Sequence, residues 1–298
     1  MDRPLHIDIG ICTFRRVSVA DTIRSVDAQH LPPDFTLRIL VADNDHAPSA
    51  RDRILACAGH TRWPVEYIHA PAGNISIARN TCLDHADADW LGFIDDDEVA
   101  RPDWIAQALH TAAMEDAQVV FWPALARYPE QTPRWIRDND FHSNRAKLRH
   151  GKVETGHTSN VLMRFNGTLA RNQRFDLDLG QSGGEDTDFF FRLSESGMTL
   201  AISEKAIVEE VVEPKRLRLP WLIERRFAEG AHYGASAPGS RAMRLGASLA
   251  KVGYCGVRTV GSPADRTAAA FWFLRAVFHC GVSAGSLGRT RRAAYGKD

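Results

Sequence analysis

Short apolar runs alternate along the first part of the chain with segments whose apolar residues recur at helical spacing. The runs predict strands over residues 5–14, 37–41, 65–69, 90–94 and 119–122. Helical spacing predicts helices over 75–85 and from Pro102 to about Glu115, and an earlier helix that carries Val19, Ile23 and Val26. Ser18 and Asp21 resemble a capping box at the start of that earlier helix. Strands that alternate with helices predict an α/β fold, a mostly parallel sheet covered by helices.

The pattern loosens after residue 125, and a strand-like segment (158–164) and a helix (185–196) then follow. From Pro214 onward the chain is helical and basic. We therefore expect one domain over 1–213, with halves of about 1–125 and about 126–213, and a helical C-terminal extension over 214–298. The length of 298 residues is sufficient for a substantial core.

The composition bears on the binding partners and the cellular compartment of the protein. The chain has 37 basic and 37 acidic residues, which gives no support for a generally basic surface that binds nucleic acid. Five scattered cysteines without zinc-ligand spacing, and a first segment without the apolar core of a secretory signal, predict a cytoplasmic protein. The most apolar late stretch, 268–282, is short and contains Arg275 and His279, so we expect any membrane contact to be peripheral.

Four consecutive acids, Asp95 to Glu98, directly follow the buried strand at 90–94. Neighbouring carboxylates at such a position repel each other unless a cation lies among them. Mg²⁺ or Mn²⁺ prefers oxygen ligands and often shares them with phosphate, which suits a nucleotide diphosphate. The alternative is a solvated acidic turn that begins the next helix.

Two other polar segments follow predicted strands, and the carboxyl ends of parallel strands meet at one edge. These are Thr13-Phe14-Arg15 and Asp43-Asn44-Asp45, so one site is predicted. The second segment either binds a base and ribose or only forms a turn. Arg79 either pairs with a phosphate or is an ordinary surface arginine. Asp186, in a glycine-flanked acidic helix start, is either a base for an acceptor hydroxyl or a simple N-terminal cap.

Taken in this order and at these distances, the segments resemble glycosyltransferase family 2, with the GT-A nucleotide-sugar fold, over most of residues 5–230. Phe93 to Asp97 resembles the family's D-x-D element, and Gly184-Glu185-Asp186 its E-D element. The resemblance implies that 1–213 is the catalytic domain, with its donor half at about 1–125 and its acceptor half at about 126–213. It implies Asp186 as the catalytic base, Asp97 as the direct metal ligand and Asp95 as a contact to metal or ribose. It implies these donor-binding residues: Thr13, Phe14, Arg15, Asp43, Asn44, Asn74, Arg79, Asp95 and Asp96. The expected acceptor-side residues are Glu185, Trp135 and Asn160.

The resemblance also implies an inverting transfer from a UDP-sugar, with Mn²⁺ or Mg²⁺, to a saccharide or polyprenyl-linked acceptor in bacterial exopolysaccharide or lipopolysaccharide synthesis. The Q-x-x-R-W motif of processive synthases is absent and Glu224 to Phe227 is the nearest element, which favours addition of a single sugar. A D-x-D-x-T phosphatase is disfavoured because Val99 stands where Thr is expected, and there is no P-loop. A noncatalytic module that binds nucleotide-sugar or polysaccharide stays open.

The late segment from Arg216 to Arg292 mixes arginines with aromatic residues, among them Trp221, Phe271 and Trp272. Interfacial helices have this composition, which predicts peripheral attachment to the cytoplasmic face of the inner membrane. A helical cap packed on the catalytic domain explains the same pattern equally well. The transferred sugar, the linkage and the oligomeric state leave no signature in the sequence.

Overall fold

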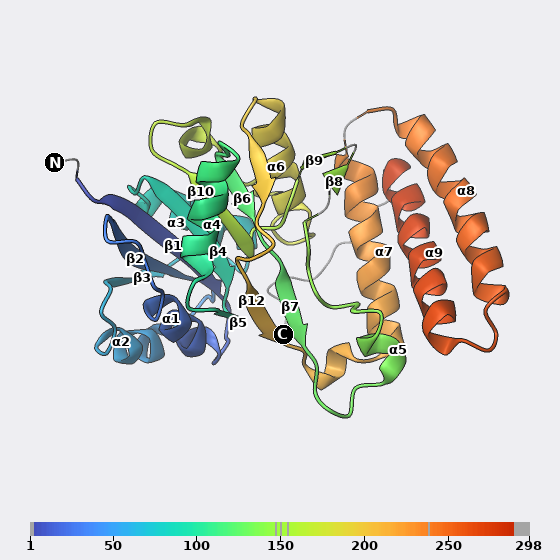
Figure 1. Cartoon of the computed structure of the whole chain (residues 1–298), viewed down its shortest axis with the longest axis horizontal. Coiled ribbons are helices and arrows are strands. Elements are labelled where there is room, and N and C mark those ends of the chain that lie inside the picture. Colours follow the sequence, from blue (N-terminus) through green and yellow to red (C-terminus); the bar gives the residue numbers. More distant parts are fainter. Residues whose placement is uncertain (1–2, 147, 150, 154, 238, 289–298) are drawn as a thin grey trace.

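The main sheet of the computed structural model is α/β in character, as predicted. The structure describes residues 3–146, 148–149, 151–153, 155–237 and 239–288. The main strands are β1 (Leu5–Thr13), β2 (Phe35–Asp43), β3 (Val65–His69), β4 (Trp90–Asp95), β6 (Val119–Phe121), β10 (Asn160–Arg164) and β11 (Leu200–Ile202). They are arranged in the order β11-β6-β10-β4-β1-β2-β3 (Figure 1). β10 runs antiparallel to β4 and β6, and the other neighbours are parallel, so the mostly parallel sheet is confirmed.

Helices cover both faces of this sheet. They are α1 (Val19–Asp27), α2 (Arg51–Ala58), α3 (Ile75–His85), α4 (Trp104–Met114) and α6 (Glu185–Glu195). One apolar core lies under α1, α2 and α4, and a second lies under α3 and α6. Alternate residues of β4 serve the two cores, with Ile94 in the first and Phe93 in the second. Burial on both faces explains the continuous apolar run in this strand.

Three short strands form a second sheet that the sequence analysis missed. β5 (Glu98–Ala100), β12 (Val208–Val211) and β7 (Ala124–Arg127) pair in the order β5-β12-β7. β5 begins at Glu98, so the acidic run leads into a strand and the alternative of an acidic turn that starts a helix is wrong. The antiparallel register of β5 and β12 places Glu210 opposite Glu98. The small elements are β8 (Leu148–Arg149), β9 (Lys152–Val153), α5 (Arg134–Arg137), η1 (Leu169–Asn172) and η2 (Pro214–Arg216).

Two predicted helix starts are wrong in detail. Ser18 stands at the N-cap of α1 in helical backbone conformation, and its side chain makes no capping hydrogen bond, so the predicted capping box is not formed. Its carbonyl oxygen still accepts from the backbone N–H of Asp21 and of Thr22. Pro102 precedes α4 rather than lying in its first turn, because the chain becomes helical only at Trp104.

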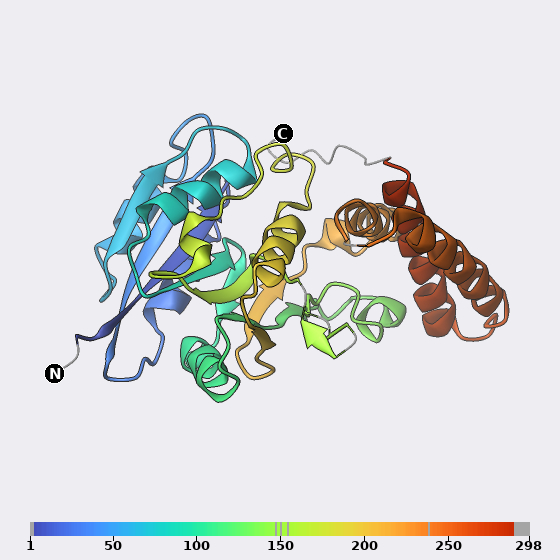
Figure 2. The ribbon, with the colours of Figure 1, turned by 90° about the horizontal axis from the view of Figure 1, so that it is seen from above.

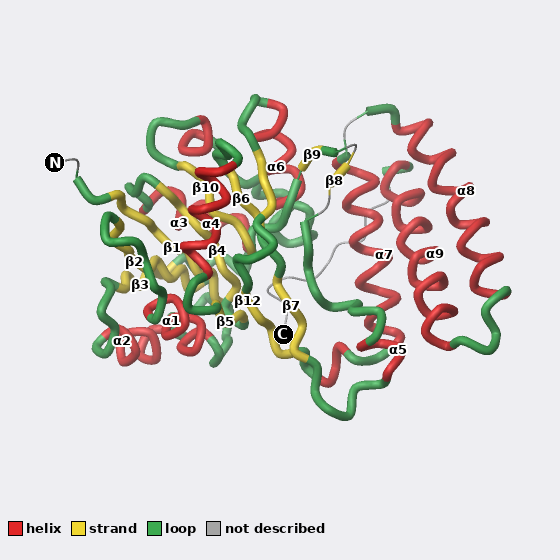
Figure 3. The backbone as a smooth tube through the Cα atoms, viewed as in Figure 1, coloured by secondary structure: helices red, strands yellow, loops and turns green. Residues whose placement is uncertain are grey.

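The chain ends in three long helices, α7 (Leu219–Ser236), α8 (Arg241–Val260) and α9 (Arg266–Ser286), which confirms the helical extension. They lie beside the catalytic sheet, with α7 nearest to it, α9 next and α8 outermost (Figures 1 and 2). Figure 3 shows that this part of the molecule is built of helices alone. The boundary at 214 stays a prediction, and residues 289–298 of the expected extension lie outside the described residues.

Backbone contact joins α7 to α9. A Cβ atom added to Gly230 or Gly234 of α7, or to Gly281 or Gly285 of α9, would lie within 1.9–2.3 Å of a carbonyl oxygen of the other helix. Among the described helices, α9 alone is long and apolar enough to cross a membrane, by length and composition. The sequence analysis expected a short apolar stretch over 268–282, interrupted by Arg275 and His279. The helix is longer and extends from Arg266 to Ser286.

Candidate active site

The three polar strand ends meet at one edge of the sheet, as predicted. In the parallel register Thr13 lies beside Asp43, and Cys12 lies beside Asp95. The hydroxyl of Thr13 donates a hydrogen bond of 2.7 Å to Asp96 Oδ2. The backbone N–H of Asn44 donates to the carbonyl oxygen of Thr13 at 2.9 Å. Strand order therefore brings segments from β1, β2 and β4 into one cluster.

Two consecutive arginines after β1 hold this cluster together. Arg15, in the left-handed backbone region with φ 57°, pairs with Asp45 at 3.0 Å, and its guanidinium lies 5.0 Å from the centre of the Phe14 ring. Arg16 contacts Asp97 at 2.5 Å and Asp96 at 3.4 Å. The sequence analysis named Arg15 and missed Arg16, although Arg16 contacts the acidic run directly.

The acidic cluster carries more negative charge than its neighbours neutralise. Burial raises the pKa of Asp95, and repulsion from Asp97 adds to that increase. Burial, together with repulsion from Asp97, raises the pKa of Asp96 to about 7 despite the hydrogen bond from Thr13. Burial and repulsion from Asp97 likewise raise the pKa of Glu210, on β12, to about 7. A bound cation would relieve this repulsion, and a donor set of carboxylate oxygens alone suits Mg²⁺ or Mn²⁺.

Glu210 and Arg216 belong to the same cluster and were missed. Arg216 pairs with Glu210 and lies 3.5 Å from Asp97 Oδ2. They come from β12 and η2, far along the chain from β4. The available signal was a second pair of acids, Glu209 and Glu210, in a short apolar segment before Pro214.

Asp186 lies at the start of α6, after two glycines whose positive φ angles of 86° and 94° only glycine adopts readily. His157 Nδ1 donates a 3.0 Å hydrogen bond to Asp186 Oδ2, and the backbone N–H of Thr187 donates to Oδ1 at 2.6 Å. Burial alone would raise the pKa of Asp186, but the hydrogen bond and charge of His157, with Arg79, hold it well below its usual value. Asp186 is therefore ionised near neutral pH.

Arg79 connects the two acidic elements. Its guanidinium forms a buried ion pair with Glu185, and its charge also acts on Asp95 and Asp186. The side chain is 10% exposed, so the alternative of an ordinary surface arginine is wrong. The negative charge of Asp186 raises the pKa of Asp95, as expected for two carboxylates on either side of one arginine. The acidic strand end and the start of α6 thus belong to a single site.

Three of the expected donor-binding residues form hydrogen bonds within the chain: Asp43, Asn44 and Asn74. Asp43 accepts hydrogen bonds from the backbone of Ala50 and from the Tyr67 hydroxyl, both at 3.0 Å. Asn44 Oδ1 accepts from the Asn74 backbone N–H at 2.7 Å. Asn74 Oδ1 accepts from the backbone of Ser76 and Ile77 and so caps α3. These residues shape the loop beside the site, and their contact with a nucleotide stays a prediction.

The expected acceptor-side residues are dispersed. Glu185 points to Arg79, and its Oε2 atom is buried without a hydrogen-bond partner among the described residues. Asn160 is buried in β10 opposite Ile94, and its amide donates to the Trp122 carbonyl oxygen. Trp135 lies elsewhere, packed with the apolar cluster of α5, α7 and α9.

The helix α7 places two side chains beside the start of α6, His232 and Arg225, which the sequence analysis did not name. His232 lies against the glycines before α6, since a Cβ atom on Gly183 would meet its ring at 2.7 Å. Arg225 is held by Glu229 at 2.8 Å, and its charge acts on Asp186. The C-terminal helices therefore contribute polar side chains beside Asp186.

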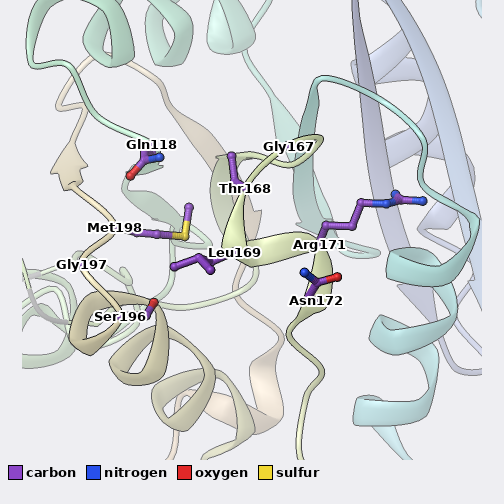
Figure 4. A pocket seen from close by; sticks show the side chains of 9 residues that line it. All are labelled: Gln118, Gly167, Thr168, Leu169, Arg171, Asn172, Ser196, Gly197 and Met198. Atoms are coloured by element: carbon purple, nitrogen blue, oxygen red, sulfur yellow. The ribbon is translucent and has the colours of Figure 1, made fainter.

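Two other features lie away from this edge. A cavity of about 550 Å³ is lined by Thr168, Asn172, Ser196 and their neighbours (Figure 4). Ser196 follows the last residue of α6, about 15 Å along the helix axis from Asp186. A second group of potential metal ligands, with atoms within 4.8 Å of one another, consists of His6, Asp8 and Asp87. It lies at the amino end of β1, and Arg38 donates hydrogen bonds to both carboxylate oxygens of Asp8.

Comparison with known proteins identifies a matching family, a similar protein and solved structures with the same fold. The family described as "Glycosyl transferase family 2" matches residues 8–168. The chain is 43% identical over 300 residues to "Succinoglycan biosynthesis protein ExoM" of Rhizobium meliloti (strain 1021), covering 98% of this chain and 96% of that protein.

Two solved structures share the fold. The mannosyltransferase PcManGT from Pyrobaculum calidifontis, in complex with GDP-Man and Mn²⁺, gives a TM-score of 0.66 at 16% identity, covering 95% of this chain and 87% of that one. S. aureus TarS 1–349 in complex with UDP-GlcNAc gives 0.55 at 11% identity, covering 94% and 90%. At these identities the likeness extends to the fold alone.

Proposed function

The chain belongs to glycosyl transferase family 2 and is a glycosyltransferase with the GT-A fold, and on this premise we propose that it adds one sugar, with inversion, from a UDP-sugar to a hydroxyl of a saccharide or polyprenyl-linked acceptor. The proposed setting is the cytoplasmic synthesis of a bacterial surface polysaccharide. The relative named for succinoglycan biosynthesis supports this setting, and TarS, with UDP-GlcNAc, supports the donor class. The five cysteines are free, as a reducing compartment would leave them.

The observation that carries the proposal is the buried pair of Arg79 with Glu185, next to Asp186, since the charge of Arg79 also acts on Asp95. Asp186 would accept the proton of the acceptor hydroxyl as the oxygen forms its bond to the anomeric carbon. The bond from that carbon to the diphosphate oxygen breaks, and the nucleoside diphosphate leaves. A weak base suffices, because the hydroxyl proton becomes acidic only as the new bond forms.

Asp95 and Asp97 would hold the divalent ion, with Glu210 next to them. When bound, such an ion stabilises negative charge on a departing diphosphate. Arg16 and Arg216 already place positive charge against Asp97, and Arg79 places it between Asp95 and Asp186. These guanidiniums would orient phosphate oxygens by charge and by paired N–H donors. We assign donor binding to the β1, β2 and β4 ends, and the acceptor to the side that Asp186, Asn160 and α7 form.

Replacement of Asp186 by Asn tests the proposal. Loss of the base should lower transfer by roughly 10²–10⁴-fold. Binding of UDP-sugars in the presence of Mn²⁺, measured by calorimetry across a donor panel, should persist. Asp188→Asn is the matched control, since Asp188 lies on the same helix and pairs with Arg192 at 2.9 Å. Unchanged transfer by Asp186→Asn would overturn the assignment, and absence of transfer by the wild-type protein with every donor would favour a binding module.

A further inference from the structure

The outermost helix, α8, carries its apolar side chains on the solvent side. The exposed fractions are 81% for Val260, 74% for Met243, 72% for Val257 and 56% for Leu249. Its buried residues are Ser248 and Cys255. At 100° per residue the four apolar residues fall on one side of the helix, opposite the two buried ones. We call these four residues the α8 face.

The inner side of α8 includes a buried polar contact. The hydroxyls of Ser248 and Ser283, on α9, share a hydrogen bond of 2.7 Å. The usual arrangement for a surface helix is the reverse, with apolar residues inward and polar residues toward water. A contiguous apolar face that remains in water is unfavourable, and on soluble proteins such a face marks an interaction site.

The charge of this region indicates the chemistry of its partner. Residues 241–288 contain six Lys and Arg and a single acid, Asp265, in a chain whose total charge is zero. Asp265 accepts hydrogen bonds from the backbone of Thr267 and Ala268, so it caps α9. Lys251 and Arg258 are exposed on α8, along the border of the α8 face. An apolar strip with a basic border complements a surface of anionic lipid headgroups over acyl chains.

Aromatic side chains on α9 lie next to basic residues of the same region. Phe271 and Phe273 are 37% and 38% exposed. The Arg258 guanidinium lies 4.5 Å from the centre of the Trp272 ring, and the Arg275 guanidinium lies 5.8 Å from that of Phe271. Arginine stems and aromatic rings that share a surface suit the boundary between headgroups and hydrocarbon, because each has an apolar body and a polar end.

A second copy of the chain fits this surface less well. Two α8 faces packed on each other would bring Lys251 and Arg258 of both copies together, and α8 has no Asp or Glu to pair with them. An anionic bilayer supplies the missing charge. We propose that the α8 face binds the surface of a membrane that contains anionic lipid.

The binding is peripheral in this arrangement. α9 has the composition of a spanning helix, but it lies between α7 and α8. Its glycines contact the backbone of α7. Because α7 also carries His232 beside the start of α6, docking through α8 would fix the orientation of the proposed acceptor side relative to the lipid.

Vesicle flotation tests the surface directly. Wild-type protein should float with phosphatidylcholine vesicles that contain phosphatidylglycerol and should remain at the bottom with phosphatidylcholine alone. Val257→Glu, which places a carboxylate on the α8 face, should abolish flotation. Lys251→Gln should lower partitioning roughly fivefold, as expected for one basic charge near such a surface.

Matched controls lie on the catalytic domain. Met114, on α4, is 72% exposed like Val257, and Lys205 is exposed in a turn. Met114→Glu and Lys205→Gln should float as the wild-type protein does. All four variants change exposed side chains, and circular dichroism should show unchanged folding.

The proposal would be overturned by equal flotation on neutral vesicles, by flotation of Val257→Glu, or by a wild-type dimer that Val257→Glu converts to a monomer in light scattering. Resistance to alkaline carbonate extraction would show an inserted α9 and would also overturn it. The readout is lipid binding, so failure here leaves the proposed transfer reaction untouched.

Discussion

His157 Nδ1 lies 3.0 Å from Asp186 Oδ2, and the ionised carboxylate accepts its hydrogen bond. His157 comes from the segment before β10 and Asp186 from the start of α6. The imidazole therefore orients the proposed base and keeps it ionised. Its proposed effect is exerted through Asp186, which makes His157 a positioning residue.

The pair predicts a pH-dependent effect of His157→Gln. Burial lowers the pKa of His157, but the hydrogen bond and charge of Asp186 outweigh burial and raise it above 6.5. A raised histidine pKa stabilises the fold fully below 6.5, and this contribution disappears as pH rises through the folded value. The lowered pKa of Asp186 gives a second contribution to the free energy of unfolding. It is fully present above pH 3.8 and is lost as pH falls through the lowered pKa. The wild-type advantage in unfolding free energy should thus be largest between these two values.

Urea denaturation of both proteins at about pH 5 and about pH 8.5 measures this difference. The histidine side chain is 40% exposed, so solvent screening should keep the effect modest. His60→Gln, at an exposed histidine after α2, should show no such trend. An advantage that grows toward alkaline pH would refute the charged pair.

Asp97→Asn should abolish the effect of metal on donor binding. In wild-type protein, UDP with Mn²⁺ should raise the melting temperature more than either alone, because binding to the native state stabilises it. The variant should lose this synergy, since it lacks a carboxylate oxygen of the proposed ion site. Asp103→Asn, an exposed acid shortly after the cluster, is the control. Synergy retained in Asp97→Asn would remove Asp97 from the metal site.

Local elements could be predicted from the sequence because their signals are local. β3 and α3 have the bounds that the apolar pattern predicted, and α3 is capped by the Asn74 that precedes the pattern. The strand-end rule also predicts that Thr13, Asp43 and Asp96 lie at one edge, where the structure has them.

The missing parts of the site depend on distant pairing. The strands β5, β7 and β12 are too short to give a periodic signal, and they form only because they hydrogen-bond to each other. Glu210 and Arg216 enter the site through that sheet. His232 enters through the packing of α7 on the domain. Trp135 is an expected acceptor-side residue, but it packs against the apolar cluster that contains Leu222 and Leu274 of the C-terminal helices.

The buried Arg79–Glu185 pair should show strong coupling in a double-mutant cycle. Arg79→Met leaves the Glu185 carboxylate buried without its cation, which should cost about 3–5 kcal/mol of unfolding free energy. Arg79→Met with Glu185→Leu removes both charges and should recover most of that loss. Urea denaturation without metal or nucleotide gives the three differences. Losses that simply add would show that the pair is not coupled.

Two Gly→Ala variants in the C-terminal helices should change stability in opposite directions. Both positions lie within helices, where Ala is favoured over Gly by about 0.5–1 kcal/mol. At Gly253 of α8 no atom lies within 4 Å of the added methyl, so Gly253→Ala should stabilise the protein. At Gly281 of α9 the methyl would lie 2.1 Å from the Phe227 carbonyl oxygen, and the two helices must separate. Overpacking of this kind costs about 1–3 kcal/mol. The helix-propensity gain is common to both variants, so the difference between their unfolding free energies isolates the α7–α9 contact. Equal stabilisation by both would show that the two backbones do not touch.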